Sequence, residues 1–345
     1  MNQKYDFIII GQGIAGSCLA YTLLQQGFNV AIVTSPSKPN ASRIAGGLMQ
    51  RISGRYLSLP KLVQDHFSTA ISFYKHIENK AQQTFLYPYP TYRIVETADE
   101  YARWDKKKAK PEYQSLMSKN LTSLSTPTLK THQAMTLYDT YVVDTEAILD
   151  WFQHYFKTQG CLFFKTISEA EISITPNSLK IQNLEADVGI FCLGSALKDL
   201  SLFQAIPFTA TKGDILCLKI NYQQDYILQH DTWLIPFKNN NYKFGATYSS
   251  DTCSLPSQKG WTYLNSCLNT LGYTNYQATS IHSAHRCALP DHFPCIGFLP
   301  NHPHIGVFGG FGSKGFITAP ALAEAWTTSV PLFNNTTSSI QRFFL

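Results

Sequence analysis

The sequence predicts a mixed α/β protein, α+β overall. A Rossmann-like nucleotide-binding domain is built from discontinuous segments and joined to an antiparallel β-rich domain. An apolar strand over 6–10 runs into the glycine turn GQGIAG at 11–16, a helical segment over 14–26 and a second strand over 28–33. This order is that of a βαβ unit with a parallel sheet. Further strand–glycine junctions follow at Gly194 and Gly309, and long β runs fill the gaps between them.

The remaining elements follow from hydrophobic periodicity and turn residues. We expect helices over 62–80, over 99–119 at the surface, and over 143–157 with Asp144 at the N-cap. We expect β structure over 85–95, 163–174, 179–181, 188–193, 209–230, 232–248 and 305–308, with a hairpin turn at 238–241. The last strand leads through a glycine bend into a final helix.

Length and composition limit the class of protein. A chain of 345 residues favours two domains, and a net charge of +5 permits an anionic partner without arguing for one. The eight cysteines form no C-x-x-C pair, which removes support for zinc-ribbon and thioredoxin folds and fits buried reduced thiols in a cytoplasmic protein. We expect no signal peptide and no membrane span, because no apolar run is long enough.

The N-terminal glycines match a dinucleotide-binding turn. Gly11 makes the tight turn, Gly13 lets a pyrophosphate approach the backbone, and Gly16 lets the helix pack closely. Such a turn usually has an acidic ribose ligand about 20 residues later. Here Thr34 and Ser35 stand in that place, and we expect their hydroxyls to bond the ribose.

No acidic residue lies between positions 6 and 65. Five basic residues share this window: Lys38, Arg43, Arg51, Arg55 and Lys61. They favour a phosphate-bearing ligand nearby, although ordinary surface residues explain some of them equally well.

The C-terminal region adds an arginine and a second glycine bend. Arg286 lies in HRCALPDHFPCIG, and the strand over 305–308 enters a bend with glycines at 309, 310, 312 and 315 before a helix. A helix start presents free N–H groups and the positive end of its dipole. It can hold the electron-rich edge of a reduced cofactor, while an arginine can hold a carboxylate or form a structural ion pair.

Three separated loops, over 41–48, 188–194 and 309–315, therefore converge on one cofactor. With them, the sequence resembles the D-amino-acid oxidase superfamily of FAD-dependent amine oxidoreductases along almost its full length. The patterns R-C-A-x-x-D-H-F-P-x-I-G from Arg286 and G-x-G-S-K-G-x-x-x-A-P from Gly310 are most similar to the FAD oxidase domain of the bacterial bifunctional tRNA 5-methylaminomethyl-2-thiouridine biosynthesis enzyme. Glycine and sarcosine oxidases are similar at the same positions, though less closely.

The resemblance implies an FAD-binding domain from segments 1–83, 140–208 and 285–345, and a substrate domain from segments 84–139 and 209–284. Taken with the glycine motif, it predicts these cofactor-binding residues: Gly11, Gly13, Ile14, Ala15, Gly16, Thr34, Ser35, Ser42, Gly46, Gly47, Leu48, Gly194, Gly310, Gly312, Ser313, Lys314, Gly315 and Phe316. It implies that Arg286 holds a substrate carboxylate. Lys314 is either a positive charge beside the flavin or a solvent-facing lysine, and Tyr248 either faces the flavin or is a core tyrosine.

The activity that follows is FAD-dependent oxidation of the C–N bond of a glycine-like or N-carboxymethyl amine, by hydride transfer to flavin and hydrolysis of the imine. The substrate is a small free amine or amino acid, or carboxymethylaminomethyl-uridine in tRNA. The bifunctional enzyme carries a methyltransferase domain ahead of its flavin domain, whereas this sequence begins at the flavin strand. The alternative is a flavin-bound subunit or scaffold without turnover. The oligomeric state, and the choice of oxygen or quinone as oxidant, stay open.

Three further features have simple interpretations. His282, His285 and His292 lack acidic or cysteine partners in the sequence pattern, so we expect no metal site. Cys287 and Cys295 raise the possibility of covalent flavin, but their spacing favours non-covalent FAD. The basic run Arg103, Lys106, Lys107, Lys108 and Lys110 is a solvated helix face, and becomes a phosphate contact if the substrate is tRNA.

Overall fold

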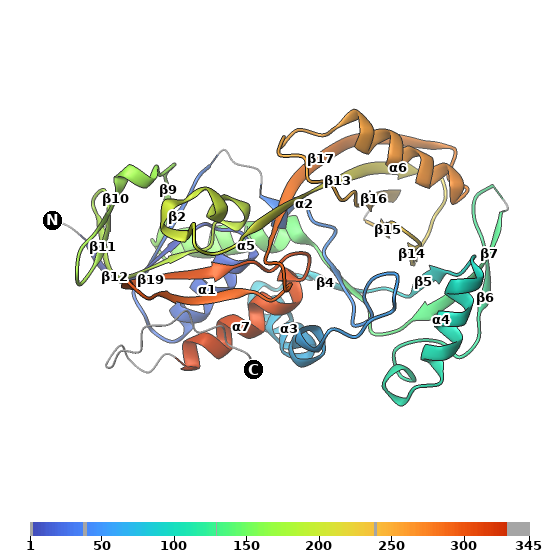
Figure 1. Cartoon of the computed structure of the whole chain (residues 1–345), viewed down its shortest axis with the longest axis horizontal. Coiled ribbons are helices and arrows are strands. Elements are labelled where there is room, and N and C mark those ends of the chain that lie inside the picture. The colour runs from blue at the N-terminus through green and yellow to red at the C-terminus, as the bar shows by residue number, and fades with distance from the viewer. Residues whose placement is uncertain (1–2, 37–39, 129, 238–239, 330–345) are drawn as a thin grey trace.

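The computed structural model of the chain describes residues 3–36, 40–128, 130–237 and 240–329. Two large β-sheets lie at opposite ends of an elongated molecule (Figure 1). Both are mixed in strand direction, and helices cover them, so the mixed α/β class predicted from the sequence is confirmed.

The first sheet has a parallel centre. Its strands are β1 (Gln3–Ile10), β2 (Val30–Thr34), β9 (Leu162–Phe164), β10 (Ile172–Ile174), β11 (Leu179–Ile181), β12 (Leu184–Phe191), β18 (Cys295–Leu299) and β19 (His302–Gly309). The order is β10-β11-β12-β1-β2-β9, and β19 pairs with both β12 and β18. The parallel strands β1, β2, β12 and β19 all end at the same edge, so the loops that follow them meet there.

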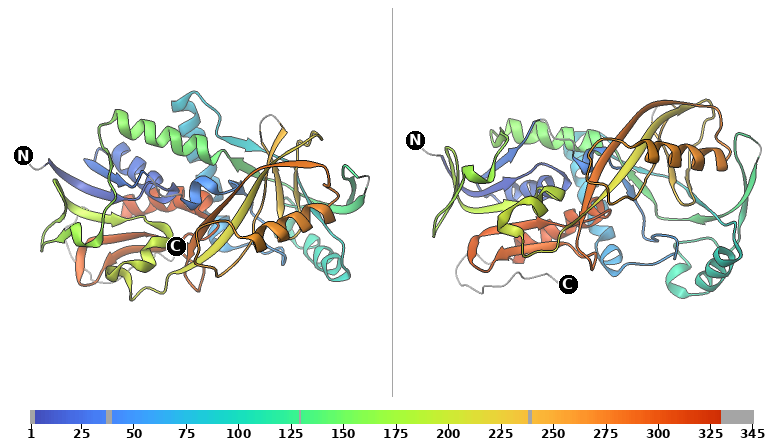
Figure 2. Two further views of the ribbon diagram at one scale, coloured as in Figure 1. Left: turned by 90° about the horizontal axis from the view of Figure 1, so that it is seen from above. Right: turned by 45° about the horizontal axis from the view of Figure 1, so that its top comes forward.

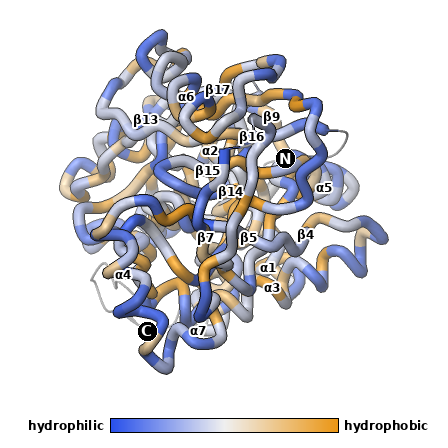
Figure 3. The backbone as a smooth tube through the Cα atoms, turned by 90° about the vertical axis from the view of Figure 1, so that its right-hand side faces the viewer, coloured by the Kyte–Doolittle hydropathy of each residue, from blue (hydrophilic) through white to orange (hydrophobic). Residues whose placement is uncertain are grey.

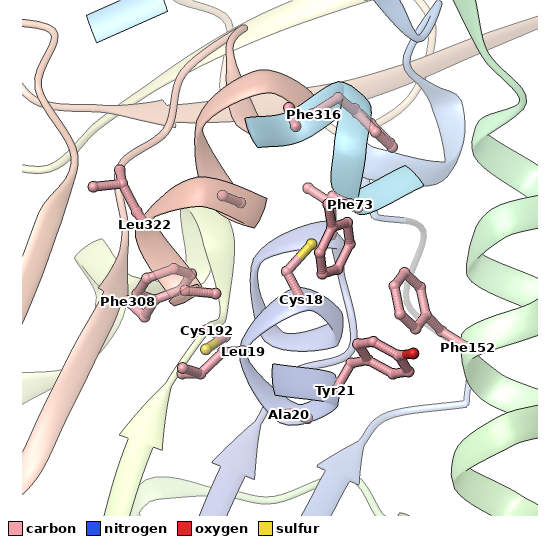
Figure 4. Packing of buried hydrophobic residues seen from close by; sticks show 14 of the residues in the cluster. Cys18, Leu19, Ala20, Tyr21, Phe73, Phe152, Cys192, Phe308, Phe316 and Leu322 are labelled. Atoms are coloured by element: carbon pink, nitrogen blue, oxygen red, sulfur yellow. The ribbon is translucent and has the colours of Figure 1, made fainter. Parts of the chain in front are cut away.

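Alternate residues of these strands pack on opposite faces. On one face, Phe7, Ile9 and Ile32 join a core with the helices α1 (Ile14–Gln25), α3 (Lys61–Ala81), α5 (Thr145–Thr158) and α7 (Gly315–Ser329). Figure 4 shows α1 in the middle of this core, with Tyr21 beside Phe73 and Phe152. On the other face, Ile8, Ile10 and Val33 pack against the 3-10 turns η3 (Gly194–Asp199) and η4 (Ser201–Phe203). Because both faces of β1 are buried, its sequence is a continuous apolar run rather than an alternation of apolar and polar residues.

The second sheet is antiparallel apart from one parallel pair, β14 with β5. Its strands are β5 (Thr91–Ile94), β6 (Thr122–Ser125), β7 (Thr131–Leu137), β13 (Thr209–Ile220), β14 (Ile227–Gln229), β15 (Trp233–Pro236), β16 (Asn241–Gly245) and β17 (Tyr276–Ala288), in the order β17-β13-β16-β15-β14-β5-β7-β6. Helix α6 (Gln258–Thr270) packs on one face through Leu264 and Leu268. A small third sheet joins β3 (Leu48–Met49), β8 (Tyr141–Val143) and β4 (Leu86–Pro88) between the two.

The long strands β13 and β17 pair over their whole length and run from the first sheet to the second (Figure 2). The division of the chain into the five predicted domain segments stays a prediction. The ladder between β13 and β17 crosses the predicted boundaries, because β17 continues without a break through residue 284 to Ala288.

Most predicted elements are present, with shifted ends. Asp144 caps α5 by accepting a hydrogen bond from the Ala147 N–H at 3.1 Å. The helix predicted over 99–119 is instead α4 (Ala98–Lys108), because Lys110 adopts an extended conformation before Pro111. The strand predicted over 163–174 is divided into β9 and β10, and that predicted over 209–230 into β13 and β14. Residues 238 and 239 of the predicted hairpin turn lie outside the described residues, but β15 and β16 on either side do pair antiparallel.

Hydropathy follows the layers: apolar segments run through the interior, and α4 is largely hydrophilic (Figure 3). Within the described ranges, no helix is both long enough and apolar enough to cross a membrane.

Candidate active site

A cavity of about 780 Å³ lies where the first sheet meets the second. Loops after β1, β2, β12 and β19 form one part of its wall, and β13, β15 and β17 form another. All the predicted cofactor-binding residues line it except Gly16 and Lys314, and Arg286 and Tyr248 line it as well. The chain therefore brings together segments that are about 300 positions apart in the sequence.

The glycine turn after β1 leaves no room for side chains. Gly11 has a φ of +108°, and a Cβ there would lie 2.6 Å from the Cys192 carbonyl oxygen. A Cβ on Gly16 would lie 1.9 Å from the Gly11 carbonyl oxygen, so α1 packs directly on the turn. Gly16 therefore does not line the cavity. It lets α1 pack on the glycine turn, in agreement with the packing role predicted for it.

The N-terminus of α1 lines this cavity through Gly13, Ile14 and Ala15. Its N-cap, Gly13, provides no side-chain hydrogen bond, and the first turn holds no acidic residue. Ser42 accepts a hydrogen bond from the Ile14 N–H at 3.0 Å, which places the 41–48 loop beside the helix end. The N-terminus of this 12-residue helix, with no acidic residue in its first turn, suits an anionic phosphate group.

Hydroxyl groups border the cavity where β2 ends. Thr34 and Ser35 line it, and the Ser35 hydroxyl lies 3.0 Å from the Thr166 hydroxyl. No described carboxylate stands at the end of β2, and the role of the two hydroxyls in binding a ribose stays a prediction. The two acidic residues of the lining, Glu169 and Asp199, come from neighbouring turns.

The four described basic residues of the acid-free window, Arg43, Arg51, Arg55 and Lys61, do not line the cavity. Arg43 pairs with Asp150, Arg51 with Asp139, and Lys61 with Asp65, while Arg55 donates to the Tyr56 hydroxyl. Ordinary pairing with acids from elsewhere in the chain thus accounts for three of them. Lys38 lies outside the described residues.

Arg286 lies on β17 with its cation in the cavity wall. One guanidinium nitrogen donates to the Thr247 carbonyl at 3.4 Å, and the guanidinium lies 4.4 Å from the centre of the Tyr248 ring. No carboxylate among the described residues forms an ion pair with it, so most of its five N–H donors have no protein acceptor. The structural ion pair considered from the sequence is absent from the described part of the chain.

Tyr248 is not a core residue. Its surface is 71 % exposed, and it borders the cavity from the segment after β16. The interpretation as a core tyrosine is wrong: Ala246 and Thr247, which follow β16, are buried, but the side chain of Tyr248 is exposed.

Lys314 points away from the cavity lining. Its ammonium group donates to the Ser53 hydroxyl at 2.7 Å, and burial lowers its pKa to about 8. The interpretation as a freely solvated lysine at a helix start does not hold. Ser313 and Gly315 on either side line the cavity, so the backbone reaches the site where the side chain does not.

Sequence reasoning missed Trp233, which lines the cavity from β15. Its indole ring lies against Gly46, where a Cβ would stand 2.6 Å from the ring atom Cη2. Trp233 stands at the start of a predicted β run. The sequence therefore indicated only that its side chain and that of Leu234 lie on opposite faces of the strand. Without the fold, nothing in the sequence indicated that its face of the strand meets the loop at 46.

The cysteines and histidines near Arg286 have other partners. Cys287 lines the cavity, and burial raises the pKa of its thiol to about 12. His282 lies 2.8 Å from the Ser280 hydroxyl, and His285 lies 2.8 Å from the Asp251 carbonyl oxygen. Among the residues that the structure describes, no cluster of histidine, cysteine, aspartate and glutamate could hold a metal ion.

The site has two unlike ends. One end has backbone donors, glycines and hydroxyls suited to a dinucleotide, and the other has a cation and two aromatic rings with no described carboxylate. Glycine-rich loops on three separate segments provide the space and the anion contacts that an FAD-sized molecule requires, so the residues fit that cofactor. The fold and this cradle define a flavin-dependent oxidoreductase.

The family model of the FAD-dependent oxidoreductases, named DAO, matches residues 6–328, and the chain belongs to this family. It is 25 % identical to the tRNA 5-methylaminomethyl-2-thiouridine biosynthesis bifunctional protein MnmC of Idiomarina loihiensis, over 93 % of this chain and 55 % of that protein. It is 22 % identical to the protein of the same name from Campylobacter concisus, over 85 % of this chain and 46 % of that one. The chain spans about half the length of these curated relatives.

Solved structures share the fold. Glycine oxidase from Bacillus cereus has a TM-score of 0.79 at 18 % identity, covering 93 % of both chains. Iminodiacetate oxidase from Chelativorans has a TM-score of 0.78 at 14 % identity, covering 95 % of this chain and 97 % of that one. L-α-glycerophosphate oxidase from Mycoplasma pneumoniae, solved with FAD bound, has a TM-score of 0.75 at 14 % identity, covering 98 % of both.

Proposed function

We propose that the protein oxidises the C–N bond of a glycine-like or N-carboxymethyl amine. The observation that carries this proposal is Arg286, a cation without a described acidic partner in the wall of the cavity that the flavin-type loops border. A planar guanidinium binds a carboxylate through two parallel hydrogen bonds, which fixes the carbon next to it. An amine that carries a carboxylate one carbon away suits this arrangement.

Each end of the cavity has a distinct role in this proposal. The N-terminus of α1 and the turn at Gly11 hold the pyrophosphate, and Thr34 and Ser35 bond the ribose. With FAD bound, backbone N–H groups at the start of α7 would stabilise the negative charge that the flavin gains on reduction. FAD supplies the acceptor for a hydride from the carbon next to nitrogen, and water then hydrolyses the resulting imine.

The substrate end requires no dedicated nucleophile. Arg286 orients the carboxylate, and Trp233 covers the loop at Gly46 and excludes water from that wall. We infer that FAD is held non-covalently, because burial of Cys287 keeps its thiol protonated and therefore unreactive.

The test is a panel of substrates offered to the purified holoenzyme: glycine, sarcosine, D-amino acids and hypomodified tRNA. Bleaching of the flavin absorbance by any member supports an oxidoreductase acting on that amine. Absence of bleaching by all of them contradicts the proposal and leaves the alternative, a flavin-bound subunit or scaffold without turnover.

A second candidate substrate is the same amine carried on tRNA. The named relatives act in tRNA modification. Lys106 on helix α4 and Lys110, two residues after its end, have no ion-pair partners among the described residues. Beside them, Arg103 and Arg55 both lie over the exposed ring of Tyr56, at 5.3 and 4.8 Å. Cations with an exposed ring are typical of surfaces that bind RNA.

Changing Lys106 and Lys110 together to glutamate tests this candidate. Weaker tRNA binding with unchanged oxidation of a free amine supports the tRNA substrate. Equal loss of both activities, or no loss of tRNA binding, contradicts it. The basic residues Lys107 and Lys108 are left unchanged because they contact Tyr113 and Trp104 within the fold.

A further inference from the structure

The exposed ring of Tyr248 lies at the mouth of the cavity. It is 71 % exposed although it belongs to the lining, and the guanidinium carbon of Arg286 lies over the ring, 4.4 Å from its centre. With the guanidinium on one side and so much of its surface open, the ring has area left for a second contact. An exposed aromatic ring of this kind can stack with another ring.

The inner end of the cavity is closed in a different manner. Trp233 on β15 is only partly exposed, and its indole ring fills the space beside Gly46, so a substituent cannot occupy that position. A substrate held by its carboxylate at Arg286 therefore has to direct any large substituent outward, past Tyr248. A substrate as small as glycine has no atoms to place there.

Arg286 takes part in both the proposed carboxylate contact and the contact with the Tyr248 ring. Its guanidinium carbon lies over the ring of Tyr248, and most of its N–H donors have no acceptor among the described residues. The same residue therefore sets the position of a bound carboxylate and the position of the exposed ring. A ligand that uses both must carry an acid and a ring close together, joined by a short linker.

We propose that Tyr248 is a stacking platform for a planar aromatic or heteroaromatic ring attached, through a short linker, to the nitrogen of the amine. The proposal rests on the function proposed above, in which Arg286 holds the carboxylate. Stacking of a base-sized ring on an aromatic side chain contributes about 1–3 kcal/mol. The platform therefore favours ring-bearing N-carboxymethyl amines over sarcosine by about tenfold, mainly through KM.

The experiment compares three amines on the holoenzyme: sarcosine, N-benzylglycine, and N-(cyclohexylmethyl)glycine as a control of equal bulk without a planar π-face. In the wild-type protein, kcat/KM is expected to be highest for N-benzylglycine. Tyr248→Leu is expected to lower the ratio of kcat/KM for N-benzylglycine to that for sarcosine about tenfold, whereas Tyr248→Phe preserves the ratio. The ratio for the cyclohexyl compound changes little in either variant.

An unchanged ratio in Tyr248→Leu overturns the platform, as does an equal fall for the benzyl and cyclohexyl compounds, which would indicate bulk rather than stacking. Dissociation constants from changes in the flavin absorbance provide the same comparison in the absence of turnover. A protein that binds N-benzylglycine in a Tyr248-dependent manner but oxidises none of the amines therefore refutes the proposed oxidation while supporting the platform.

Discussion

Gly213 lies directly under the guanidinium of Arg286. A Cβ on Gly213 would stand 2.3 Å from Nη2 and 2.7 Å from the central guanidinium carbon. Gly213 on β13 faces Ala284 across the ladder, two positions before Arg286 on β17. The position of the arginine in the cavity wall therefore depends on the absence of a side chain on the neighbouring strand.

Gly213→Ala is expected to displace the guanidinium and to raise KM for a carboxylate substrate about tenfold. The fold should tolerate the change, because the atoms that the new methyl group meets are at the far end of a flexible side chain. Steady-state kinetics with sarcosine and a thermal melt measure the two effects. A KM equal to that of the wild type would show that Arg286 does not bind the substrate from its present position.

Arg286→Met is expected to raise KM by about 30-fold or more, since it removes a charge-assisted pair of hydrogen bonds. Arg286→Lys keeps the charge but not the planar fork, so it should recover only part of this loss. The flavin content of both variants, measured by absorbance, controls for folding. Unchanged kinetics in Arg286→Met would refute the assigned role.

Gly11→Ala is expected to abolish FAD binding, because the new Cβ would meet the Cys192 carbonyl oxygen at 2.6 Å on a backbone with positive φ. Gly27→Ala is the matched control: Gly27 also has a positive φ, of +87°, but no atom lies within 4 Å of a Cβ there. Both variants bear the strain of a left-handed residue, about 1–2 kcal/mol. Only Gly11→Ala should purify without flavin. Loss of flavin from both would assign the effect to strain alone.

Lys314 should make the stability of the flavin-free protein depend on pH. Its pKa is lowered from 10.5 to about 8 in the folded chain, so the folded state releases this proton first as the pH rises. The unfolded state then binds more protons, and the free energy of unfolding rises between about pH 8 and pH 10.5. Lys314→Met should lack this rise in urea denaturation curves. Parallel curves for the two proteins across that range would contradict the burial of the ammonium group.

Local signals in the sequence predicted the elements around the cofactor. Glycines at 11, 13 and 16 and the apolar strand before them have no other common use, and Asp144 is a standard helix cap. The glycine bend that holds Gly310 was visible in the sequence, whereas the specific roles of Ser42 and Gly46 beside the flavin came from family resemblance.

The substrate end was harder to predict because it depends on contacts between distant segments. Arg286 was found through its motif, but the Gly213 that makes room for it and the Thr247 carbonyl that it contacts are far away in the sequence. The same is true of Trp233, whose importance comes from the loop at Gly46. The partner of Lys314, Ser53, lies 261 positions away, so the burial of that lysine had no local signal.

The β13–β17 ladder has a consequence for how a substrate enters. The ladder joins the two sheets through pairing from Thr209 to Ile220, with one register shift between Cys217 and Leu218. Its end is held to the bend at Gly312 by a 2.7 Å hydrogen bond from the Gly312 N–H to the Cys287 carbonyl. A hinge motion of one sheet relative to the other would have to break the pairing of β13 with β17 or this hydrogen bond. Substrate entry should therefore depend on the short coil segments that border the cavity, while Arg286 keeps a fixed position relative to the bend at Gly312.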